Sequence, residues 1–374
     1  MQGTPEGTAA QDLRRIYTLQ IILTNHCNLN CTYCYVRRDE IRSIPMETAK
    51  AAIREMAETH LPQEWLCMVA FMGGEPLAEF DKLRNLCEWM WAAYPDHDIR
   101  VHSPTNGTLI TDEVRRFMTE NRGRVSFGLS YDGEWAQNVN RSDSDAMINP
   151  RMFRDLWPEQ LFKMTVTEES VPTLAQSIIT MHENGYRLGA NPACGEPPWS
   201  MENVREFGRQ MLLLAEYYAR HPEVTPVDML DVDLRLVPYY REPMRPTCGI
   251  GNDYVTVDTD GGVYPCHMFS SLALTQEQKE RAAAFCMGER RDFDVPACKD
   301  CILRLVCPRC YGMSFLRTGD PFAVDINMCR LFRQQVKGAC SYQIKRMAQL
   351  ETMTENDHLI MQGIRLILSR MQFS

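Results

Sequence analysis

The chain has 374 residues, 44% of them hydrophobic and 24% charged, and its formal net charge is −9. These values are typical of a globular protein, and the length predicts two or three domains. The acidic balance, without a long basic run, argues against a nucleic-acid partner, because phosphate binding needs a basic surface. No apolar stretch is long enough to span a membrane, and residues 1–11 form no apolar signal region, so we expect a cytoplasmic protein without a membrane partner.

Fifteen cysteines are the most informative part of the composition. In a large chain from a reducing compartment, this number indicates metal or redox centres rather than disulfides. The cysteines are also unevenly placed, with three in residues 27–34 and five in residues 298–329. Both regions are therefore candidate sites.

Strand and helix signals alternate along the first part of the chain. Runs of β-branched and aromatic residues predict strands at residues 16–24, 66–72, 99–103, 125–130, 162–166 and 186–190. Helical periodicity, with Pro45 and Asp112 at two helix starts, predicts helices at residues 45–60, 80–93, 112–121, 171–184 and 201–218. This alternation predicts an α/β fold with a parallel sheet, which we interpret as a partial TIM-type barrel of six strand–helix units.

The regular pattern fades after about residue 240, where cysteines crowd together and strands become short. We therefore expect the barrel to be followed by a small cysteine-rich domain and a helical C-terminal segment. The predicted division is an N-terminal tail at residues 1–15, the barrel at 16–240, the cysteine-rich domain at 241–333 and the helical segment at 334–374.

The first cysteine group follows the first predicted strand with the spacing C-x3-C-x2-C, formed by Cys27, Cys31 and Cys34. Three thiolates at this spacing can hold three irons of a four-iron cluster and leave one iron open for a small molecule. A structural zinc site or a disulfide is the alternative. Zinc in a closed site prefers four protein ligands, and only three are local here.

This motif resembles the signature of the radical SAM enzymes, in which the open iron chelates S-adenosylmethionine and the reduced cluster cleaves it to a 5′-deoxyadenosyl radical. Gly73-Gly74-Glu75-Pro76 and Ser130-Tyr131-Asp132-Gly133, each after a predicted strand, are similar to two further motifs of that family. The resemblance implies that the first of these receives the methionine amino group on its backbone. Thr105-Asn106-Gly107 is expected either to line the same face or to form a simple turn.

The resemblance also assigns individual cofactor contacts. Tyr33 would lie near the adenine, and Ser130 and Arg141 would bind the cofactor carboxylate, to which a guanidinium can donate two hydrogen bonds. Two alternatives stay open: Gly73, Gly74 and Glu75 could belong to an ordinary turn, and Arg141 could be a solvated loop arginine.

The second cysteine group resembles the SPASM domain, a C-terminal extension of peptide-modifying radical SAM enzymes. Its pattern is C-x12-G-x4-C, then C-x2-C-x5-C-x2-C, then a last cysteine, and the final C-x2-C is one residue shorter than in that family. The resemblance implies two auxiliary [4Fe–4S] clusters and thus three in total. The outer cluster would use Cys298, Cys301, Cys307 and Cys329, and the inner one Cys248, Cys266 and Cys310. A zinc ribbon is the alternative, but five residues between the C-x2-C pairs are too few for two opposed knuckles.

The inner set lacks the eighth cysteine that fully ligated members carry a few residues before the position of Cys248. We therefore hypothesise an open iron there, filled by a substrate thiolate, water, Glu242 or Cys286. The remaining cysteines are expected to be buried free thiols, namely Cys67, Cys87, Cys194 and Cys340.

The SPASM resemblance implies a peptide or protein substrate and an electron donor such as flavodoxin or ferredoxin. His267 stands where sulfatase maturases have an aspartate base; it could act as a base or donate a hydrogen bond to cluster sulfur. This departure favours maturation of a ribosomally made peptide, through a thioether or other cross-link, over formylglycine formation by a sulfatase maturase. Only about fifteen residues precede the first strand, so we expect that a partner protein or the barrel surface recognises the leader, or that the substrate has no leader. A non-catalytic electron carrier is the alternative from another class.

Overall fold

The main sheet contains six strands in the order β4-β3-β2-β1-β7-β8. The computed structural model describes residues 16–60, 65–194, 198–244, 246, 248–251, 254–289 and 292–371, so the predicted tail at 1–15 lies outside the described residues. The strands are β1 (Ile16–Thr24), β2 (Leu66–Gly73), β3 (Asp98–Thr105), β4 (Val125–Leu129), β7 (Tyr254–Val257) and β8 (Val263–Tyr264). All neighbours are parallel except β7 and β8, which form an antiparallel pair.

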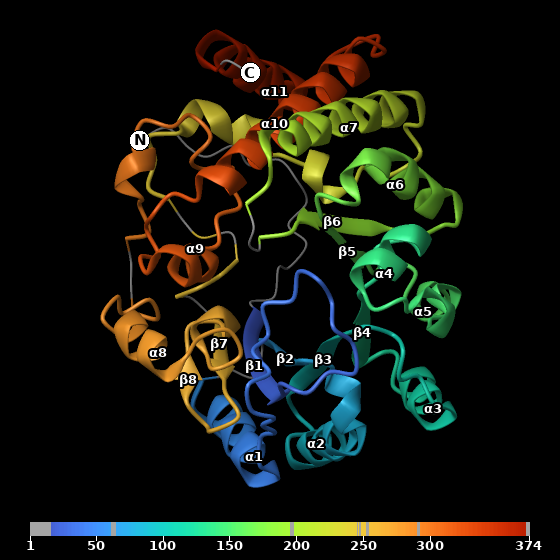
Figure 1. Cartoon of the computed structure of the whole chain (residues 1–374), viewed down its shortest axis with the longest axis vertical. Coiled ribbons are helices and arrows are strands. Elements are labelled where there is room, and N and C mark those ends of the chain that lie inside the picture. The colour runs from blue at the N-terminus through green and yellow to red at the C-terminus, as the bar shows by residue number, and fades with distance from the viewer. Residues whose placement is uncertain are drawn as a thin grey trace.

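The strand wall continues through a second, two-stranded parallel sheet of β5 (Phe162–Val166) and β6 (Leu188–Pro192). A single parallel bridge between Ser130 and Lys163 links it to the main sheet. Figure 1 shows the six strands β1 to β6 as an open arc with helices on its outer side. The predicted α/β partial barrel is therefore confirmed, and strand β7 of the cysteine-rich region extends its sheet beyond β1.

The α-helices of the described residues are α1 (Met46–Glu55), α2 (Phe80–Ala93), α3 (Asp112–Glu120), α4 (Glu134–Asn140), α5 (Pro150–Leu156), α6 (Leu174–Glu183), α7 (Met201–Arg220), α8 (Gln276–Ala283), α9 (Tyr311–Thr318), α10 (Ile326–Met347) and α11 (Glu355–Arg370). Helices α1, α2, α3, α5 and α6 lie on the outer side of the strand arc, and α9 lies at its open side (Figure 1). A π-helical turn at Met56–His60 continues α1, and a 3₁₀ turn at Val171–Thr173 precedes α6. No helix within the described ranges is long and apolar enough to cross a membrane.

Three local predictions differ from the structure for identifiable reasons. Strand β6 begins at Leu188 rather than Tyr186, because the Tyr186 N–H donates to the Met181 carbonyl and still belongs to the end of α6. Helix α3 is capped by Thr111, whose hydroxyl accepts from the Val114 N–H, and not by Asp112. Helix α10 begins at residue 326, inside the expected cysteine-rich domain.

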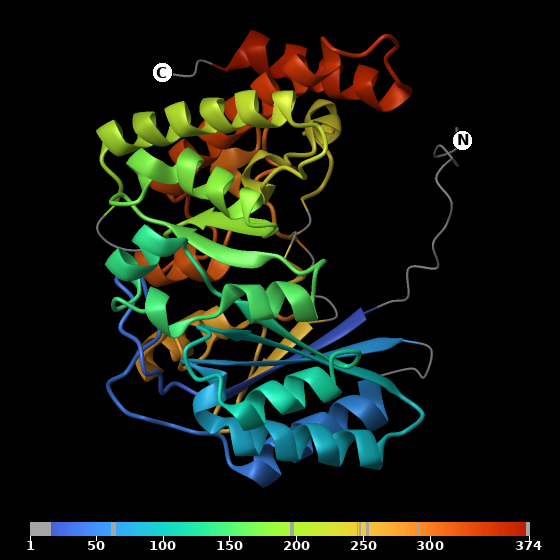
Figure 2. The same cartoon turned by 90° about the vertical axis from the view of Figure 1, so that its right-hand side faces the viewer.

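The core lies between the strands and the surrounding helices. Its largest fully buried side chains include Phe71 on β2, Phe127 on β4 and Phe207 on α7. Helix α10 packs across α7, where Gly338 leaves room for Met211, and Figure 2 shows α10 and α11 stacked over α7 at one end of the molecule. The C-terminal helices thus cover the end of the barrel wall.

Gly363 of α11 tests this packing, because a Cβ there would lie 2.0 Å from the backbone oxygen of Leu234. We predict that Gly363→Ala destabilises the protein by about 1–3 kcal/mol, since the helix must move away from a rigid backbone. Thermal unfolding followed by circular dichroism measures the loss. Gly123→Ala is the matched control, because a Cβ at Gly123 meets nothing within 4 Å. Equal melting temperatures of the two variants would contradict the contact.

Candidate active site

The first cysteine loop is held by the glycine turn at the end of β2. The Gly74 N–H donates to the Thr24 carbonyl and the Glu75 N–H donates to the His26 carbonyl, both at 2.8 Å. A Cβ on Gly73 would lie 2.0 Å from the Thr24 oxygen, and one on Gly74 would lie 2.2 Å from the His26 oxygen. The two glycines are therefore needed because the turn packs directly on the backbone that leads into the cysteines.

A cavity of about 640 Å³ opens at the carboxyl ends of the strands. The structure brings together most of the predicted cofactor residues in its wall, which includes Cys27, Cys31, Tyr33, Cys34, Gly74, Glu75, Asn106, Ser130 and Arg141. The opposite wall comes from helix α9 and contains Met313, Leu316 and Arg317. The cavity therefore lies between the barrel and the cysteine-rich region.

The three thiols have a chemistry that suits a metal cluster. Burial raises the pKa of the Cys31 thiol to about 11 and also raises the pKa of Cys27 above its ordinary value. The guanidinium of Arg38 lies 3.7 Å from the Cys34 sulfur. Thiolates in such a place need positive charge for stability, and bound iron supplies it. The three cysteines therefore fit an iron–sulfur cluster.

The Glu75 carboxylate in the cavity wall is held by three hydrogen bonds from neighbouring residues and is therefore not a free charge. It accepts from the Leu77 N–H at 3.0 Å, the Thr105 hydroxyl at 2.9 Å and the Asn106 N–H at 2.7 Å. Burial raises its pKa to about 7, and these donors act in the opposite direction. The contacts join the end of β2 to the end of β3, so the Thr105-Asn106-Gly107 turn lines the same face as the cysteines.

Asp132 lies in the Ser130-Tyr131-Asp132-Gly133 motif after β4, and the sequence predicted no individual role for it. Its carboxylate is fully buried and accepts from the Tyr33 hydroxyl at 2.7 Å, the Arg141 Nε at 2.9 Å and the Thr165 N–H at 2.8 Å. The Arg141 guanidinium also lies 5.2 Å from the centre of the Tyr33 ring, a cation–π contact. Arg141 is therefore a buried, oriented side chain and not a solvated loop arginine. An acidic residue in the motif just before a predicted carboxylate-binding arginine was the sequence feature that could have indicated the role of Asp132.

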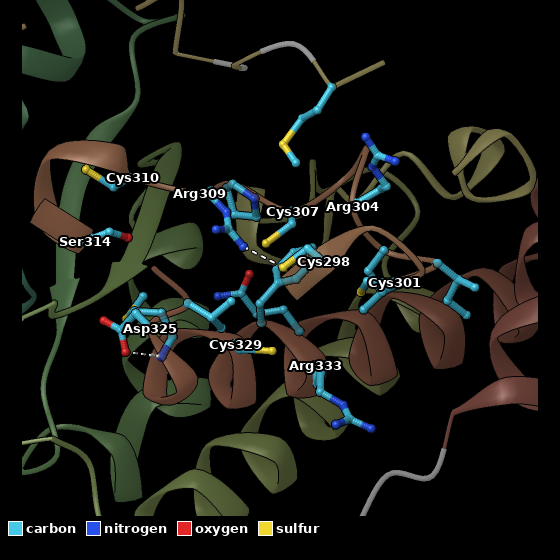
Figure 3. Close-up of a pocket in the computed structure, with 18 of the residues that line it drawn as sticks. Cys298, Cys301, Arg304, Cys307, Arg309, Cys310, Ser314, Asp325, Cys329 and Arg333 are labelled. Atoms are coloured by element: carbon cyan, nitrogen blue, oxygen red, sulfur yellow. Dashed lines mark hydrogen bonds between the residues drawn. The ribbon is translucent and has the colours of Figure 1, made fainter. Parts of the chain in front are cut away.

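A second cavity of about 580 Å³ adjoins the first. Cys298, Cys301, Cys307 and Cys329 line it together, the last from the first turn of α10 (Figure 3). Within the described parts of the chain, no three His, Cys, Asp or Glu side chains are placed to hold a single metal ion. The four thiols line one cavity, and their ligation of a cluster stays a prediction.

The inner set is positioned by other elements. Cys310 is the N-cap of α9, where its sulfur accepts from the Met313 N–H at 3.3 Å, and it points away from the outer four in Figure 3. Its charge and that of Cys248 act on the pKa of Cys266, which burial raises to about 12. The three thiols are therefore near one another. Cys286 is exposed and its thiol donates to the Ala283 carbonyl, so its place at the open iron stays a prediction.

His267 lies near the first cavity but is not among the residues that line it. Its Nδ1 is 3.2 Å from the Gln20 Oε1, which also accepts from the Thr256 hydroxyl, and its ring stacks on Tyr35 with centroids 5.9 Å apart. Burial lowers its pKa to about 4, so it is neutral at physiological pH. Tyr35 lines the cavity, and His267, stacked on it, is not among the lining residues.

The expectation of buried free thiols holds for Cys67, Cys87 and Cys340. Cys194 differs, because it is only partly buried and lines both cavities. It follows strand β6, whose end faces the cysteine-rich region, and the sequence pattern alone gave no signal for this position.

The comparisons with known proteins agree with this geometry. The sequence profile of the Radical SAM superfamily matches residues 21–134. A cysteine-type anaerobic sulfatase-maturating enzyme of Clostridium perfringens is 32% identical over 278 residues, covering 65% of this chain and 72% of the relative. An uncharacterized protein of Methanocaldococcus jannaschii is 32% identical over 219 residues, covering 55% of this chain and 74% of the relative.

Solved structures share the fold at lower identity. The structure of anSMEcpe with bound AdoMet aligns with a TM-score of 0.67 at 19% identity, and the alignment covers 93% of this chain and 98% of that chain. Streptococcus suis SuiB bound to the precursor peptide SuiA aligns with a TM-score of 0.53 at 14% identity, covering 85% of this chain and 76% of that chain.

The chain therefore belongs to the radical SAM superfamily, with the SPASM-type architecture of the sulfatase-maturase-like enzymes. Its cofactors include S-adenosylmethionine and an iron–sulfur cluster.

Gly74→Ala should weaken S-adenosylmethionine binding, because the new Cβ pushes the turn away from the cysteine loop. A displacement of about 1 Å at a catalytic site can cost about 100-fold in rate, and we expect the affinity for S-adenosylmethionine to fall as well. Equilibrium binding to the anaerobically reconstituted protein measures this loss, with iron content per chain as the companion readout. Gly123→Ala, which changes an exposed turn, should bind like the wild type. Wild-type affinity in Gly74→Ala would show that the turn does not position the cofactor.

Asp132→Asn should destabilise the fold and the cofactor site together. Tyr33 and Arg141 both donate to Oδ2 and the Thr165 N–H donates to Oδ1, so an amide must turn its NH2 group toward at least one of these donors. The buried guanidinium also loses its counter-charge, which typically costs about 3–5 kcal/mol. Chemical denaturation reports the stability, and a binding titration reports the affinity for S-adenosylmethionine. Asp112→Asn, whose ion pair with Arg115 is exposed, is the control and should change stability by under about 1 kcal/mol. Identical behaviour of both variants would contradict the role of Asp132.

Proposed function

We propose that this protein is a radical SAM enzyme that abstracts a hydrogen atom from a peptide or protein substrate, in the maturation of a ribosomally made peptide. The observation that carries this proposal is the cavity of about 640 Å³ with cofactor-binding residues on one wall and helix α9 on the other. Held by Cys27, Cys31 and Cys34, a reduced cluster would supply the electron for reductive cleavage of S-adenosylmethionine. The substrate would enter between the barrel and α9.

The residues of the barrel wall would divide the work of holding the cofactor. Cys27, Cys31 and Cys34 would ligate the cluster, and the backbone of Gly74 would receive the methionine amino group. Arg141 uses its Nε for Asp132, so its two Nη groups can donate to the cofactor carboxylate beside Ser130.

The opposite wall would shape the substrate side. Met313 and Leu316 give it an apolar surface that keeps water away from a reactive radical. Arg317 is oriented by an ion pair of 2.7 Å with Asp325, so its position in this wall is fixed. A guanidinium there can hold a backbone carbonyl or an acidic group of a peptide.

The cysteine-rich region would hold two auxiliary clusters, which makes three in total. We propose the division into the barrel at 16–240, the SPASM domain at 241–333 and the helical segment at 334–374. Helix α10 joins the last two, because it begins at Ile326 and carries Cys329. A flavodoxin or ferredoxin would supply electrons.

Sulfatase maturation, with formation of formylglycine, is the second candidate. The Clostridium perfringens relative, named as a sulfatase-maturating enzyme, favours it. The position of His267 favours the cross-link instead, because this neutral imidazole is stacked behind Tyr35 and bound to Gln20. A base for substrate deprotonation would have to face the cavity.

Anaerobic turnover tests the proposal. The reconstituted protein, reduced with dithionite or flavodoxin and given S-adenosylmethionine, should form 5′-deoxyadenosine, and Cys34→Ala should not. No 5′-deoxyadenosine under either reductant would overturn the proposal and favour an electron carrier. A cysteine-containing peptide then separates the two reactions. A thioether consumes the thiol without an aldehyde, whereas formylglycine is an aldehyde that a hydrazide traps.

A further inference from the structure

Arg309 occupies an unusual place in the outer cysteine cavity. It lies in the short Cys307-Pro308-Arg309-Cys310 segment, between a residue of the outer set and a residue of the inner set. Its backbone N–H donates to the Cys307 carbonyl at 2.8 Å, which turns the side chain into the cavity. Figure 3 shows the guanidinium among the cysteines, with a hydrogen bond to Cys298.

The guanidinium of Arg309 is only partly used by the protein. Nη2 donates to the Cys298 sulfur at 2.9 Å. Nε and Nη1 are buried and have no hydrogen-bond partner among the described residues. Buried N–H groups are almost always satisfied, so two unpaired donors beside four thiols call for an acceptor in the cavity. The sulfur atoms of an iron–sulfur cluster are such acceptors.

The other arginines around this cavity are arranged differently. Arg304 is bound to Asp294 and to the Lys299 carbonyl. Arg333 points away from the four cysteines in Figure 3. Arg370 donates to the Tyr240 hydroxyl at 3.0 Å. Arg309 is thus the guanidinium that extends between Cys298 and Cys307.

We propose that Arg309 is a positioning residue that donates hydrogen bonds to the sulfur atoms of the outer auxiliary cluster and raises its reduction potential; the proposal rests on the proposed function in that this cavity holds a cluster. Reduction adds negative charge to a cluster. A fixed positive charge and N–H donors stabilise that charge, and hydrogen bonds to the sulfurs are a known determinant of the potential. The outer cluster then becomes a better electron acceptor than it would be without Arg309.

A redox titration of the full-length reconstituted protein, followed by electron paramagnetic resonance, tests the proposal. The signal of the outer cluster is identified by its loss in Cys329→Ala. Its midpoint potential should become more negative in Arg309→Met, which lacks charge and donors. The shift should have the same sign but be smaller in Arg309→Gln, which keeps donors, and in Arg309→Lys, which keeps the charge and donors. Arg330→Gln removes the same charge from an exposed position next to Cys329 and should leave the potential unchanged.

Two results would overturn the inference about Arg309, and only the second of them would also overturn the proposal of three clusters. If all Arg309 variants keep about twelve irons per chain and the wild-type potential, Arg309 does not tune the cluster and the proposed function stands. If the wild type binds only about eight irons and Cys329→Ala does not lower that number, the outer cluster itself is absent and the three-cluster proposal fails too. Should Arg309→Met lose iron, the Gln and Lys variants still give the comparison.

Discussion

The site depends on the close packing of the glycine turn after β2 on the backbone that follows β1. Gly73 and Gly74 have no space for a side chain, because the carbonyl oxygens of Thr24 and His26 lie where a Cβ would be. Two backbone hydrogen bonds hold the turn there. The cysteine loop is therefore positioned by main-chain contacts, and the same turn directs Glu75 toward the end of β3.

Two further links connect this turn and the cysteine loop to the neighbouring strands of the barrel. Glu75 links β2 to the Asn106 turn, and Asp132 links the end of β4 to β5 and to Tyr33 of the cysteine loop. Each link is a buried carboxylate that accepts several hydrogen bonds, so each is rigid as long as all its donors are present. Buried acids thus orient the predicted cofactor-binding groups, and α9 lies at the open side of the arc.

Much of the barrel could be predicted from the sequence, because buried strands with turn residues at their ends have strong local signals. Strands β1 and β5 have the predicted bounds. Strand β7 could not be found this way. It has only four residues, and its partner β1 is more than 200 positions away in the chain. Its pairing with β1 ties the cysteine-rich region to the barrel.

The candidate site also has residues that the sequence could predict and residues that it could not. The cysteines and the glycine turn are contiguous motifs, so their spacing carried the signal. The roles of Asp132 and Arg309 arise from contacts between distant segments, and neither residue type is distinctive in its local sequence. Cys194, expected to be a buried thiol, lines both cavities because strand β6 ends where they meet.

The central claim is that Cys27, Cys31 and Cys34 hold a cluster with one open iron that binds S-adenosylmethionine. Low-temperature electron paramagnetic resonance of the reduced protein, recorded with and without S-adenosylmethionine, tests it most directly. We predict that the cofactor changes the signal of this cluster and that Cys34→Ala abolishes the change. An identical spectrum with and without S-adenosylmethionine in the wild type would contradict the account.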